Sequence, residues 1–418
     1  MNYGIITIGS MGDVKPFVAL GKGLKKRGHR VKLTTFSKFR EYVEANGIEY
    51  GPLTGDAAEV IKQLVGLHVS SYEYFMNLGK LLKPVKKQFL SDIEQACAGM
   101  DAILYSTLGA VAWHVADKYG IPCFRVHFCP LDPTNEFPVM TAPILPFGAP
   151  YNRLTFWTGD RLWSHVTRKY LNDWRVEMGL EKIMPFAFPY RCLHGEKIPT
   201  LYPYSSLLCP KPHEYGKEKY LTGFWTDADD ADYQPDEKLA EFLAAGPKPI
   251  YLGFGSTVGG DYDQALSIVL ESLKRTKQRG IFSAGWGDLS KIKLPDNVIQ
   301  VDYVPHEWLF ERVSAVVHHG GAGTTAAALR AKAPNIIIPF GGDQPFWGNC
   351  IYNQGLGPKP IMRKRLTADN LSAAILETVQ NTQIIENSRK IGTLLRDENG
   401  VENAISVIEQ KTCGKLLK

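Results

Sequence analysis

Residues 316–325 read VVHHGGAGTT, in which an apolar strand runs into a glycine-rich turn and an alanine-rich helix follows. Such a turn exposes backbone N–H groups at the positive end of a helix, where a diphosphate is stabilised. The glycines let an anion approach closely, Thr324 and Thr325 can donate hydroxyl hydrogens, and a histidine can donate a ring N–H. A glycine-rich turn alone is also a packing feature, but the His and Thr pairs beside it favour a phosphate-binding segment.

Short apolar strands alternate with helices on both sides of this segment. This rhythm predicts parallel sheets with helices on both faces, an α/β fold of doubly wound type. Strands are expected at Ile5–Ile8, Arg30–Thr35, Ala102–Tyr105 and Cys123–His127, and in a second series at Pro249–Phe254, Ile281–Ala284, Val298–Tyr303, Ala315–His318 and Asn335–Pro339.

The length of 418 residues exceeds what one ordinary hydrophobic core accommodates, so two domains are expected. Residues 210–215 contain Pro and Lys and are a linker candidate between the two series. We predict an N-terminal domain over 1–212, a C-terminal domain over 213–385 and terminal helices over 386–418. Two doubly wound halves would place a ligand cleft between them, at the carboxyl ends of both sheets.

The composition is that of an ordinary globular protein, with 44% hydrophobic and 22% charged residues. The net charge of +5 suits an anionic small molecule or surface, and no run of Lys and Arg suggests a nucleic-acid platform. The seven cysteines are scattered and include no CxxC pair that would indicate zinc. We therefore expect buried, reduced thiols.

The first residues enter a strand without a basic leader or a cleavage site, and no apolar stretch reaches the roughly 18 residues of a membrane span. These features predict a cytoplasmic protein. Lysines within residues 80–87 interleave with apolar side chains. That pattern suits either a weak contact with an anionic membrane surface or an ordinary solvated helix face.

A helix is expected over Asn152–Trp174, after a proline-rich zone at 130–150. Its aromatic and apolar residues recur at three- or four-residue spacing, namely Phe156, Trp163, Val166, Tyr170 and Trp174. Two uses of this stripe are open. It packs against its own domain, as such helix faces ordinarily do, or it docks on lipid or lines an apolar ligand pocket.

A polar pair, Asp343 and Gln344, follows the strand expected at Asn335–Pro339. The two side chains offer acceptors and donors suited to sugar hydroxyls, on the rim expected for residues 316–325. Asp343 also suits the N-cap of a helix with Pro345 in its first turn. Capping and sugar binding are compatible, so we predict a sugar contact here.

The first strand leads into the turn GSMGD at residues 9–13, whose spacing is not that of a GxGxxG dinucleotide fingerprint. A carboxylate that faces the cleft can act as a general base, whereas the alternative makes Asp13 the N-cap of a helix starting near Lys15. An ordinary carboxyl pKa of about 4 makes a weak base, so the site must raise it or the proton must move late. His127 closes its strand at the same rim of the expected cleft. Three roles are open for it: a contact with a substrate, assistance to Asp13, or a purely structural role.

Three ordered segments carry a family resemblance: VPHEWLF at 304–310, HHGGAGTT at 318–325 and GDQPFW at 342–347. They resemble the nucleotide-sugar motif of sterol 3-beta-glucosyltransferases. More broadly, the chain is similar to inverting glycosyltransferases of the GT-B fold, among them antibiotic aglycone and plant natural-product enzymes. The resemblance extends over nearly the whole chain through GSMGDVKP at 9–16, YNRL at 151–154, NDWR at 172–175, GFGS at 253–256 and SAGWG at 283–287.

The resemblance implies two facing Rossmann-like domains, with terminal helices that cross back to the first. It also implies a nucleotide-sugar site. His319 and the amides of Gly321, Gly323 and Thr324 would bind the diphosphate, and Asp343 and Gln344 would bind the sugar. Ser256 would contact the phosphates or the ribose, and the Val304 backbone would contact the base. Tyr303 stands where plant enzymes place a tryptophan against uracil. Trp286 is a candidate substitute, or else an interdomain packing residue.

The resemblance also implies the reaction. Asp13 would be the base, with His127 and Met11 as acceptor contacts, and His319 rather than His318 would hold the phosphates. The expected activity moves a hexose, glucose from UDP-glucose, to a hydroxyl of an apolar acceptor such as a sterol, with no metal and no cofactor beyond the sugar nucleotide. Phenolic and polyketide acceptors stay open, as does a sugar-nucleotide epimerase of the same architecture.

Overall fold

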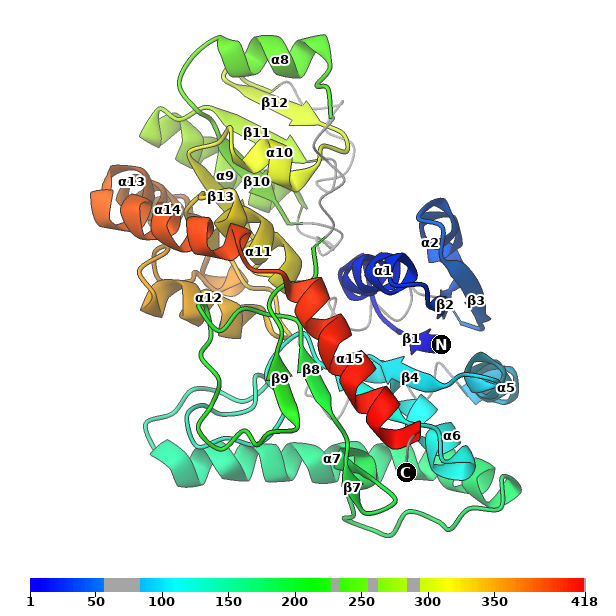
Figure 1. Ribbon diagram of the computed structural model, residues 1–418. Coiled ribbons are helices and arrows are strands. Elements are labelled where there is room, and N and C mark those ends of the chain that lie inside the picture. Colours follow the sequence, from blue (N-terminus) through cyan, green and yellow to red (C-terminus); the bar gives the residue numbers. More distant parts are fainter. Residues whose placement is uncertain (56–82, 227–232, 255–261, 284–293, 417–418) are drawn as a thin grey trace. The chain divides into compact units, whose positions relative to one another are not determined.

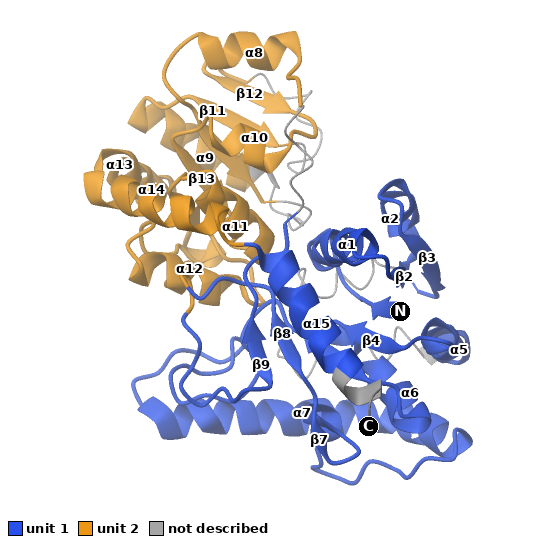
Figure 2. Ribbon diagram, in the orientation of Figure 1, with its two compact units in different colours: residues 1–206, 210–226, 399–418 blue, residues 207–209, 227–398 orange. Residues whose placement is uncertain are grey.

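The computed structural model describes residues 1–55, 83–226, 233–254, 262–283 and 294–416 (Figure 1). The chain forms two compact units (Figure 2). Unit 1 comprises residues 1–206, 210–226 and 399–418, and unit 2 comprises residues 207–209 and 227–398.

Unit 1, as far as it is described, contains a seven-stranded parallel sheet in the order β3-β2-β1-β4-β5-β8-β9. Its strands are β1 (Asn2–Ile6), β2 (Arg30–Phe36), β3 (Glu49–Leu53), β4 (Ala102–Tyr105), β5 (Cys123–Val126), β8 (Thr200–Tyr202) and β9 (Lys219–Leu221), beside the antiparallel pair β6 (Cys192–Leu193) and β7 (Glu196–Lys197). Its helices are α1 (Met11–Lys26), α2 (Arg40–Ala45), α5 (Lys86–Cys97), α6 (Ala112–Tyr119), α7 (Gly148–Glu177) and α15 (Gly400–Leu416).

The strand order of unit 1 reverses between β1 and β4, which is the mark of a doubly wound sheet. Successive residues of β1 point to opposite faces: the ring of Tyr3 contacts His29, whereas Gly4 faces Met100 at the end of the α5 segment. On the Tyr3 face α15 packs against α1, where a Cβ on Gly23 would lie 2.6 Å from Val401. The terminal helix is therefore part of unit 1.

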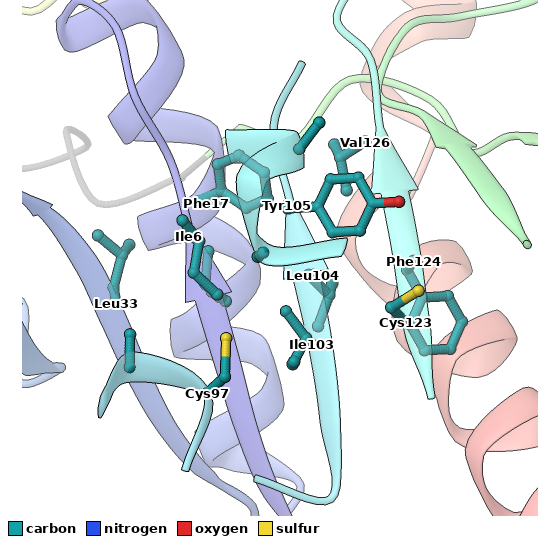
Figure 3. Packing of buried hydrophobic residues seen from close by; sticks show 14 of the residues in the cluster. Ile6, Phe17, Leu33, Cys97, Ile103, Leu104, Tyr105, Cys123, Phe124 and Val126 are labelled. Atoms are coloured by element: carbon teal, nitrogen blue, oxygen red, sulfur yellow. The ribbon is translucent and has the colours of Figure 1, made fainter. Parts of the chain in front are cut away.

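The central strands β1, β4 and β5 of unit 1 are almost entirely buried, as expected for a sheet that is covered on both faces. Figure 3 shows Ile6, Leu104 and Val126, from three adjacent strands, packed in one cluster with Phe17 of α1. Leu20 and Leu24, predicted on the same helix face as Phe17, are also fully buried. The predicted amphipathic helix is confirmed.

The aromatic stripe of α7 packs against its own unit. Phe156, Val166 and Trp174 are buried, and Trp163 and Tyr170 are half-buried against the core. The ordinary use of the stripe is therefore the correct one, and α7 extends beyond both expected ends. None of the described helices is long and apolar enough to cross a membrane.

Unit 2, within its described residues, has a five-stranded parallel sheet in the order β12-β11-β10-β13-β14. Its strands are β10 (Ile250–Gly253), β11 (Gly280–Ser283), β12 (Val298–Val301), β13 (Ala315–His318) and β14 (Asn335–Ile337). Its helices are α8 (Glu237–Ala244), α9 (Tyr262–Thr276), α10 (His306–Phe310), α11 (Ala322–Arg330), α12 (Gln344–Asn353), α13 (Ala368–Gln380) and α14 (Thr382–Arg396).

This second sheet is also doubly wound, because its order reverses between β10 and β13. Alternate residues of β10 enter separate cores: Ile250 and Leu252 join one cluster, and Tyr251 joins the other. Each expected strand is present in its unit, and the largest shifts of the strand ends are at β1, β12 and β14. The α/β prediction is confirmed for both halves.

The units divide later in the chain than the boundaries expected at 212 and 385. Strand β9 pairs with β8, so unit 1 continues to Thr226. Helix α14 packs against α11 and stays in unit 2, so the chain returns to unit 1 only at Asn399. Edge pairing and helix packing, rather than linker composition, set both divisions.

The cysteines form no disulfide. Four of them are buried as expected, Cys350 is half-buried, and two are exposed. Cys192 and Cys413 are exposed, the first on the short β6–β7 pair and the second on α15.

Candidate active-site residues in the two units

The predicted donor-site residues of unit 2 follow successive strands of its parallel sheet. Carboxyl ends of parallel strands meet at one edge, and ligands bind where the strand order reverses. The residues that the structure describes are Val304 after β12, His319, Gly321, Gly323 and Thr324 after β13, and Asp343 and Gln344 after β14. Ser256 and Trp286 lie outside the described residues.

His318 is fully buried at the end of β13. Its Nδ1 lies 3.1 Å from the Gly320 amide, which donates to it, so Nε2 carries the proton and donates to Asn335 Oδ1 at 2.9 Å. Burial, with His319 beside it, lowers the pKa of His318 to about 3. With both ring nitrogens engaged, His318 closes the strand, as the sequence predicted.

His319 turns toward the beginning of α11. Its Nε2 lies 2.5 Å from the position that a Cβ on Gly321 would occupy. Its Nδ1 is buried and finds no partner among the described residues. Burial lowers the pKa of His319 to about 4, so the ring is neutral at neutral pH and can donate one N–H.

Helix α11 begins without a side-chain cap, because its N-cap residue is Gly321. The first N–H groups of an α-helix have no acceptor within the helix, so those of Ala322, Gly323 and Thr324 are suited to an anion. No atom lies within 4 Å of a Cβ placed on Gly323. Thr325 is fully buried and its hydroxyl has no partner among the described residues, so its expected contact with a ligand stays a prediction.

Gly320 brings the two donor segments together. Its φ of 91° lies in the left-handed region, which suits glycine. A Cβ there would lie 2.7 Å from Ile337 Cγ2 and 3.1 Å from the Gln344 carbonyl oxygen. The turn after β13 is therefore in close contact with the beginning of α12, and a larger residue would separate them.

Gln344 has a fixed orientation. Its Oε1 accepts hydrogen bonds from the backbone N–H groups of Phe340 at 2.7 Å and Gly341 at 3.3 Å. Because these donors select the amide oxygen, the NH₂ group is the end that remains, and it has no partner among the described residues. This geometry offers two hydrogens to a ligand hydroxyl.

Asp343 occupies the N-cap position of α12, but its side chain makes no capping bond. Its Oδ2 instead accepts from the indole N–H of buried Trp347 at 2.9 Å. The capping interpretation of its side chain is therefore wrong, while Pro345 does occupy the first turn. The indole holds this carboxylate in place beside Gln344.

Val304 lies between β12 and α10, and its side chain is buried in the core of unit 2. Only its backbone is therefore suited to the predicted contact with a base. Tyr303 is 71% exposed, so its ring is open to solvent where plant enzymes have tryptophan.

Asp13 follows β1 in unit 1 and lies in the first turn of α1, which begins at Met11. Its Oδ2 accepts from the backbone N–H of Ser10 at 2.7 Å and from the Ser10 hydroxyl at 3.0 Å. The Ser10 Oγ in turn accepts from the Gly12 N–H at 3.2 Å. Ser10 is the N-cap, so the alternative in which Asp13 caps a helix starting near Lys15 is wrong.

Ser10 is the orienting group of Asp13 that our sequence interpretation missed. The signal is present in the sequence, because Ser10-Met11-Gly12-Asp13 has the spacing of a capping box. Burial raises the pKa of Asp13, and the hydrogen bonds from Ser10 oppose that rise. A Cβ on Gly9 would lie 2.2 Å from Asp13 Oδ2, so glycine leaves the space that the carboxylate fills.

The turn after β4 lies directly beside the turn after β1. The Ile8 N–H donates to Ser106 Oγ at 3.2 Å, and a Cβ on Gly109 would lie 2.4 Å from the Ile6 carbonyl oxygen. This is the point where the strand order of unit 1 reverses. Asp13 is therefore at the position where doubly wound sheets bind ligands.

His127 follows β5 and is 5% exposed. Its Nδ1 and the hydroxyl of Thr107, which follows β4, are 2.8 Å apart, and its Nε2 has no partner among the described residues. Burial, helped by Arg125, lowers the pKa of His127 to about 3. His127 is neutral and anchored by Thr107, and Met11 is 37% exposed at the start of α1.

A buried ion network, which the sequence did not indicate, supports this part of unit 1. Asp132 accepts from Arg125 at 3.0 Å, Arg191 at 3.0 Å and the Tyr202 hydroxyl at 2.8 Å. Burial opposes its ionisation, yet the cations around it hold the pKa of Asp132 well below its usual range. Arg191 also binds both oxygens of Asp160 on α7, which ties that helix to the turn after β5.

Family comparisons match both halves of the chain. Residues 3–138 match the glycosyltransferase family 28 N-terminal domain, and residues 282–404 match the erythromycin biosynthesis protein CIII-like C-terminal domain. Two solved structures share the fold. CalG4, the calicheamicin glycosyltransferase, has a TM-score of 0.73 at 16% identity over 100% of this chain and 99% of that one. The glycosyltransferase VinC, in complex with dTDP, has a TM-score of 0.64 at 18% identity over 98% and 99%.

Sequence relatives are more specific. A sterol 3-beta-glucosyltransferase of Arabidopsis thaliana is 37% identical over 426 residues, 98% of this chain and 68% of the relative. A second one from the same plant is 37% identical over 97% of this chain and 64% of the relative. One from Yarrowia lipolytica is 35% identical over 98% of this chain but only 28% of its own length. The chain belongs to the sterol 3-beta-glucosyltransferase family and is a glycosyltransferase of the GT-B fold.

Proposed function

We propose that this chain transfers glucose from UDP-glucose to the hydroxyl group of a sterol or a similar apolar alcohol, with inversion at the anomeric carbon. The observation that carries the proposal is the Asp13 carboxylate, held by Ser10 at the point of strand reversal with a pKa raised by burial. The names of the relatives support the sugar and the acceptor class.

The chemistry is one displacement. The acceptor hydroxyl oxygen forms a bond to C1 of the sugar while Asp13 takes the hydroxyl proton. The bond between C1 and the diphosphate oxygen breaks, and UDP leaves with the electron pair. A single displacement inverts the configuration at C1. A carboxylate with a raised pKa suits this step, because it holds the proton more firmly than an ordinary aspartate does.

The donor side needs no metal in this proposal. The first-turn N–H groups of α11 and the neutral ring of His319 would donate to the diphosphate and stabilise the charge that develops on UDP. The NH₂ group of Gln344 and the Asp343 carboxylate would bind sugar hydroxyls. The Val304 backbone would contact the base, and no cofactor beyond the sugar nucleotide is required.

The acceptor side would use His127 and Met11. A neutral His127, anchored through Thr107, can exchange a hydrogen bond with the acceptor hydroxyl through Nε2. Met11 offers an adaptable apolar contact for a bulky ring system.

A substrate panel tests the proposal. Purified protein is incubated with UDP- and dTDP-sugars and with sterol, phenolic and polyketide acceptors, and products are identified by mass spectrometry. We expect a sterol glucoside from UDP-glucose, with a beta anomeric linkage by NMR. Transfer only to phenolic or polyketide acceptors would contradict the acceptor class. A retained alpha linkage would contradict the inverting mechanism. Epimerisation of the UDP-sugar in the absence of an acceptor would show that the protein is an epimerase instead.

A further inference from the structure

Bulky apolar side chains are exposed in one region of unit 1. More than half of the exposed large hydrophobic residues in the described part of the chain lie between residues 144 and 186. Five of them, which we call the α7 surface, are 40–68% exposed: Ile144, Leu145, Phe147, Leu154 and Trp157. Soluble monomers rarely expose a contiguous apolar patch without a binding role.

The loop that carries the first three of these residues is fastened to α7. The Tyr151 hydroxyl donates to the Pro143 carbonyl oxygen at 2.6 Å, and the rings of Phe147 and Tyr151 make an edge contact at 6.0 Å. Further back in the loop, the Val139 N–H donates to Thr155 Oγ1 at 2.9 Å. Loop and helix therefore present one formed surface, along the helix that borders unit 1 in Figure 1.

The α7 surface is a different helix face from the aromatic stripe. Leu154, Trp157 and Arg161 recur at three- and four-residue spacing, so they share one face. Leu154 and Trp157 are exposed, whereas Phe156 and Trp174 on the inner face are buried. The helix thus buries one aromatic face in its own unit and leaves a second apolar face uncovered by described residues.

The charged side chains within residues 141–172, which include the α7 surface, are mostly positive. Arg161 lies over the Trp157 ring at 4.5 Å, and Arg153 and Lys169 are exposed. The only carboxylate between residues 141 and 172 is Asp160, and both of its oxygens are bound by Arg191. Within this stretch of the chain, exposed apolar side chains therefore occur together with an excess of positive charge.

We propose that the α7 surface docks on an anionic lipid bilayer. Tryptophan prefers the membrane interface, Leu and Phe side chains gain from entering the acyl boundary, and arginines are attracted to anionic head groups. A second copy of this chain is a poorer occupant, because the arginines of two such surfaces would face each other. The inference goes beyond the proposed function and does not depend on glycosyl transfer.

The test is co-sedimentation of the full chain with sucrose-loaded vesicles, made of phosphatidylcholine alone or mixed with phosphatidylserine. We expect binding to the anionic vesicles that weakens with added salt. Replacing Leu154 and Trp157 together by Ser should lower the partition coefficient at least about tenfold, since two apolar side chains that would insert into the bilayer are lost. A matched control replaces Leu394 and Tyr352, each 47% exposed in unit 2, by Ser and should bind as wild type does.

A charge variant separates the two contributions. Replacing Arg153 and Arg161 by Gln should weaken binding to vesicles with phosphatidylserine and leave the residual affinity for phosphatidylcholine unchanged. Thermal unfolding by circular dichroism confirms that each variant is folded, which is expected because the substituted side chains are at the surface. Sedimentation velocity without lipid reports the oligomeric state of each variant.

Three outcomes would overturn the proposal. Wild-type protein that sediments with neither vesicle type does not dock on this lipid. A Leu154 and Trp157 double variant that binds as wild type does would place docking elsewhere. A wild-type dimer that becomes monomeric in the double variant, without lipid binding, would assign the α7 surface to self-association.

Discussion

The Asp13 carboxylate and Ser10 close a capping box at the start of α1, and both hydrogen bonds from Ser10 reach the same oxygen, Oδ2. One residue therefore begins the helix and orients the proposed base. We expect a substrate proton to be taken by the other oxygen, Oδ1. The relationship couples a local folding signal to the chemistry of the site.

Replacing Ser10 by Ala should slow transfer and shift its pH dependence. The Ser10 side chain lowers the pKa of Asp13, so its loss should move the acidic limb of the kcat profile to higher pH. Stability should fall by about 1 kcal/mol from the lost cap. Kinetics across pH and thermal unfolding measure both effects, and Ser10→Thr should restore them. An unchanged acidic limb of the pH profile would show that Ser10 is only a structural cap.

Replacing Asp13 by Asn should abolish the base while keeping the capping box, because an amide oxygen can still accept from Ser10. Loss of a general base typically costs about 10²- to 10⁴-fold in rate. Donor binding should be unaffected, since Asp13 is in unit 1. Turnover with a sterol acceptor and UDP calorimetry make the comparison. Near wild-type turnover would show that Asp13 is not the base.

The same Asp13→Asn variant should be more stable than wild type at neutral pH. The pKa of Asp13 is raised in the folded state above its ordinary value of 3.8, so folded protein binds the proton more tightly than unfolded protein. The wild type consequently loses stability as pH rises between these two pKa values. The difference in unfolding free energy should vanish below pH of about 4. A constant difference at all pH values would contradict the raised pKa.

Replacing Gly321 by Ala should weaken UDP binding without unfolding unit 2. The added Cβ would lie 2.5 Å from His319 Nε2, so the ring must move away from the beginning of α11. We expect roughly a tenfold loss of affinity, similar to that of His319→Ala, from one lost hydrogen bond to a charged group. Gly159→Ala, which meets nothing within 4 Å, is the matched control. Calorimetry measures the UDP affinity of each variant. An unchanged affinity in both site variants would show that His319 does not bind the diphosphate.

Two substitutions of Gln344 separate its structural role from its proposed role in sugar recognition. Gln344→Glu keeps an acceptor for the Phe340 and Gly341 N–H groups but removes the NH₂ donors. We expect a higher KM for UDP-glucose with unchanged UDP affinity and stability. Gln344→Leu should in addition lose about 1–3 kcal/mol of stability, because two backbone donors lose their acceptor. Equal KM values for Gln344→Glu and wild type would argue against a sugar contact.

Local signals in the sequence were sufficient for the five strands of the unit 2 sheet, for four of the seven strands of the unit 1 sheet and for the turn after β13. Most of these strands are short apolar runs, and Gly320 has the positive φ that a glycine-rich turn requires. Strands β3, β8 and β9 were not predicted. Gly51 and Pro52 interrupt the pattern of β3, and the three residues of β8 or of β9 are too few to show a period. The capping box at Ser10 was present in the sequence but was overlooked.

The sequence by itself determined the two doubly wound halves, the order of the site segments and the position of His318 as the residue that closes its strand. These follow from apolar period, turn chemistry and residue type, which act over a few neighbouring residues. Only the tertiary structure decided which polar side chains are hydrogen-bonded and which residues are their partners. Trp347 holds Asp343, Thr107 contacts His127, and Asp132 gathers two arginines. Those partners are distant in sequence or depend on side-chain orientation, and only packing of the elements brings them within hydrogen-bond range.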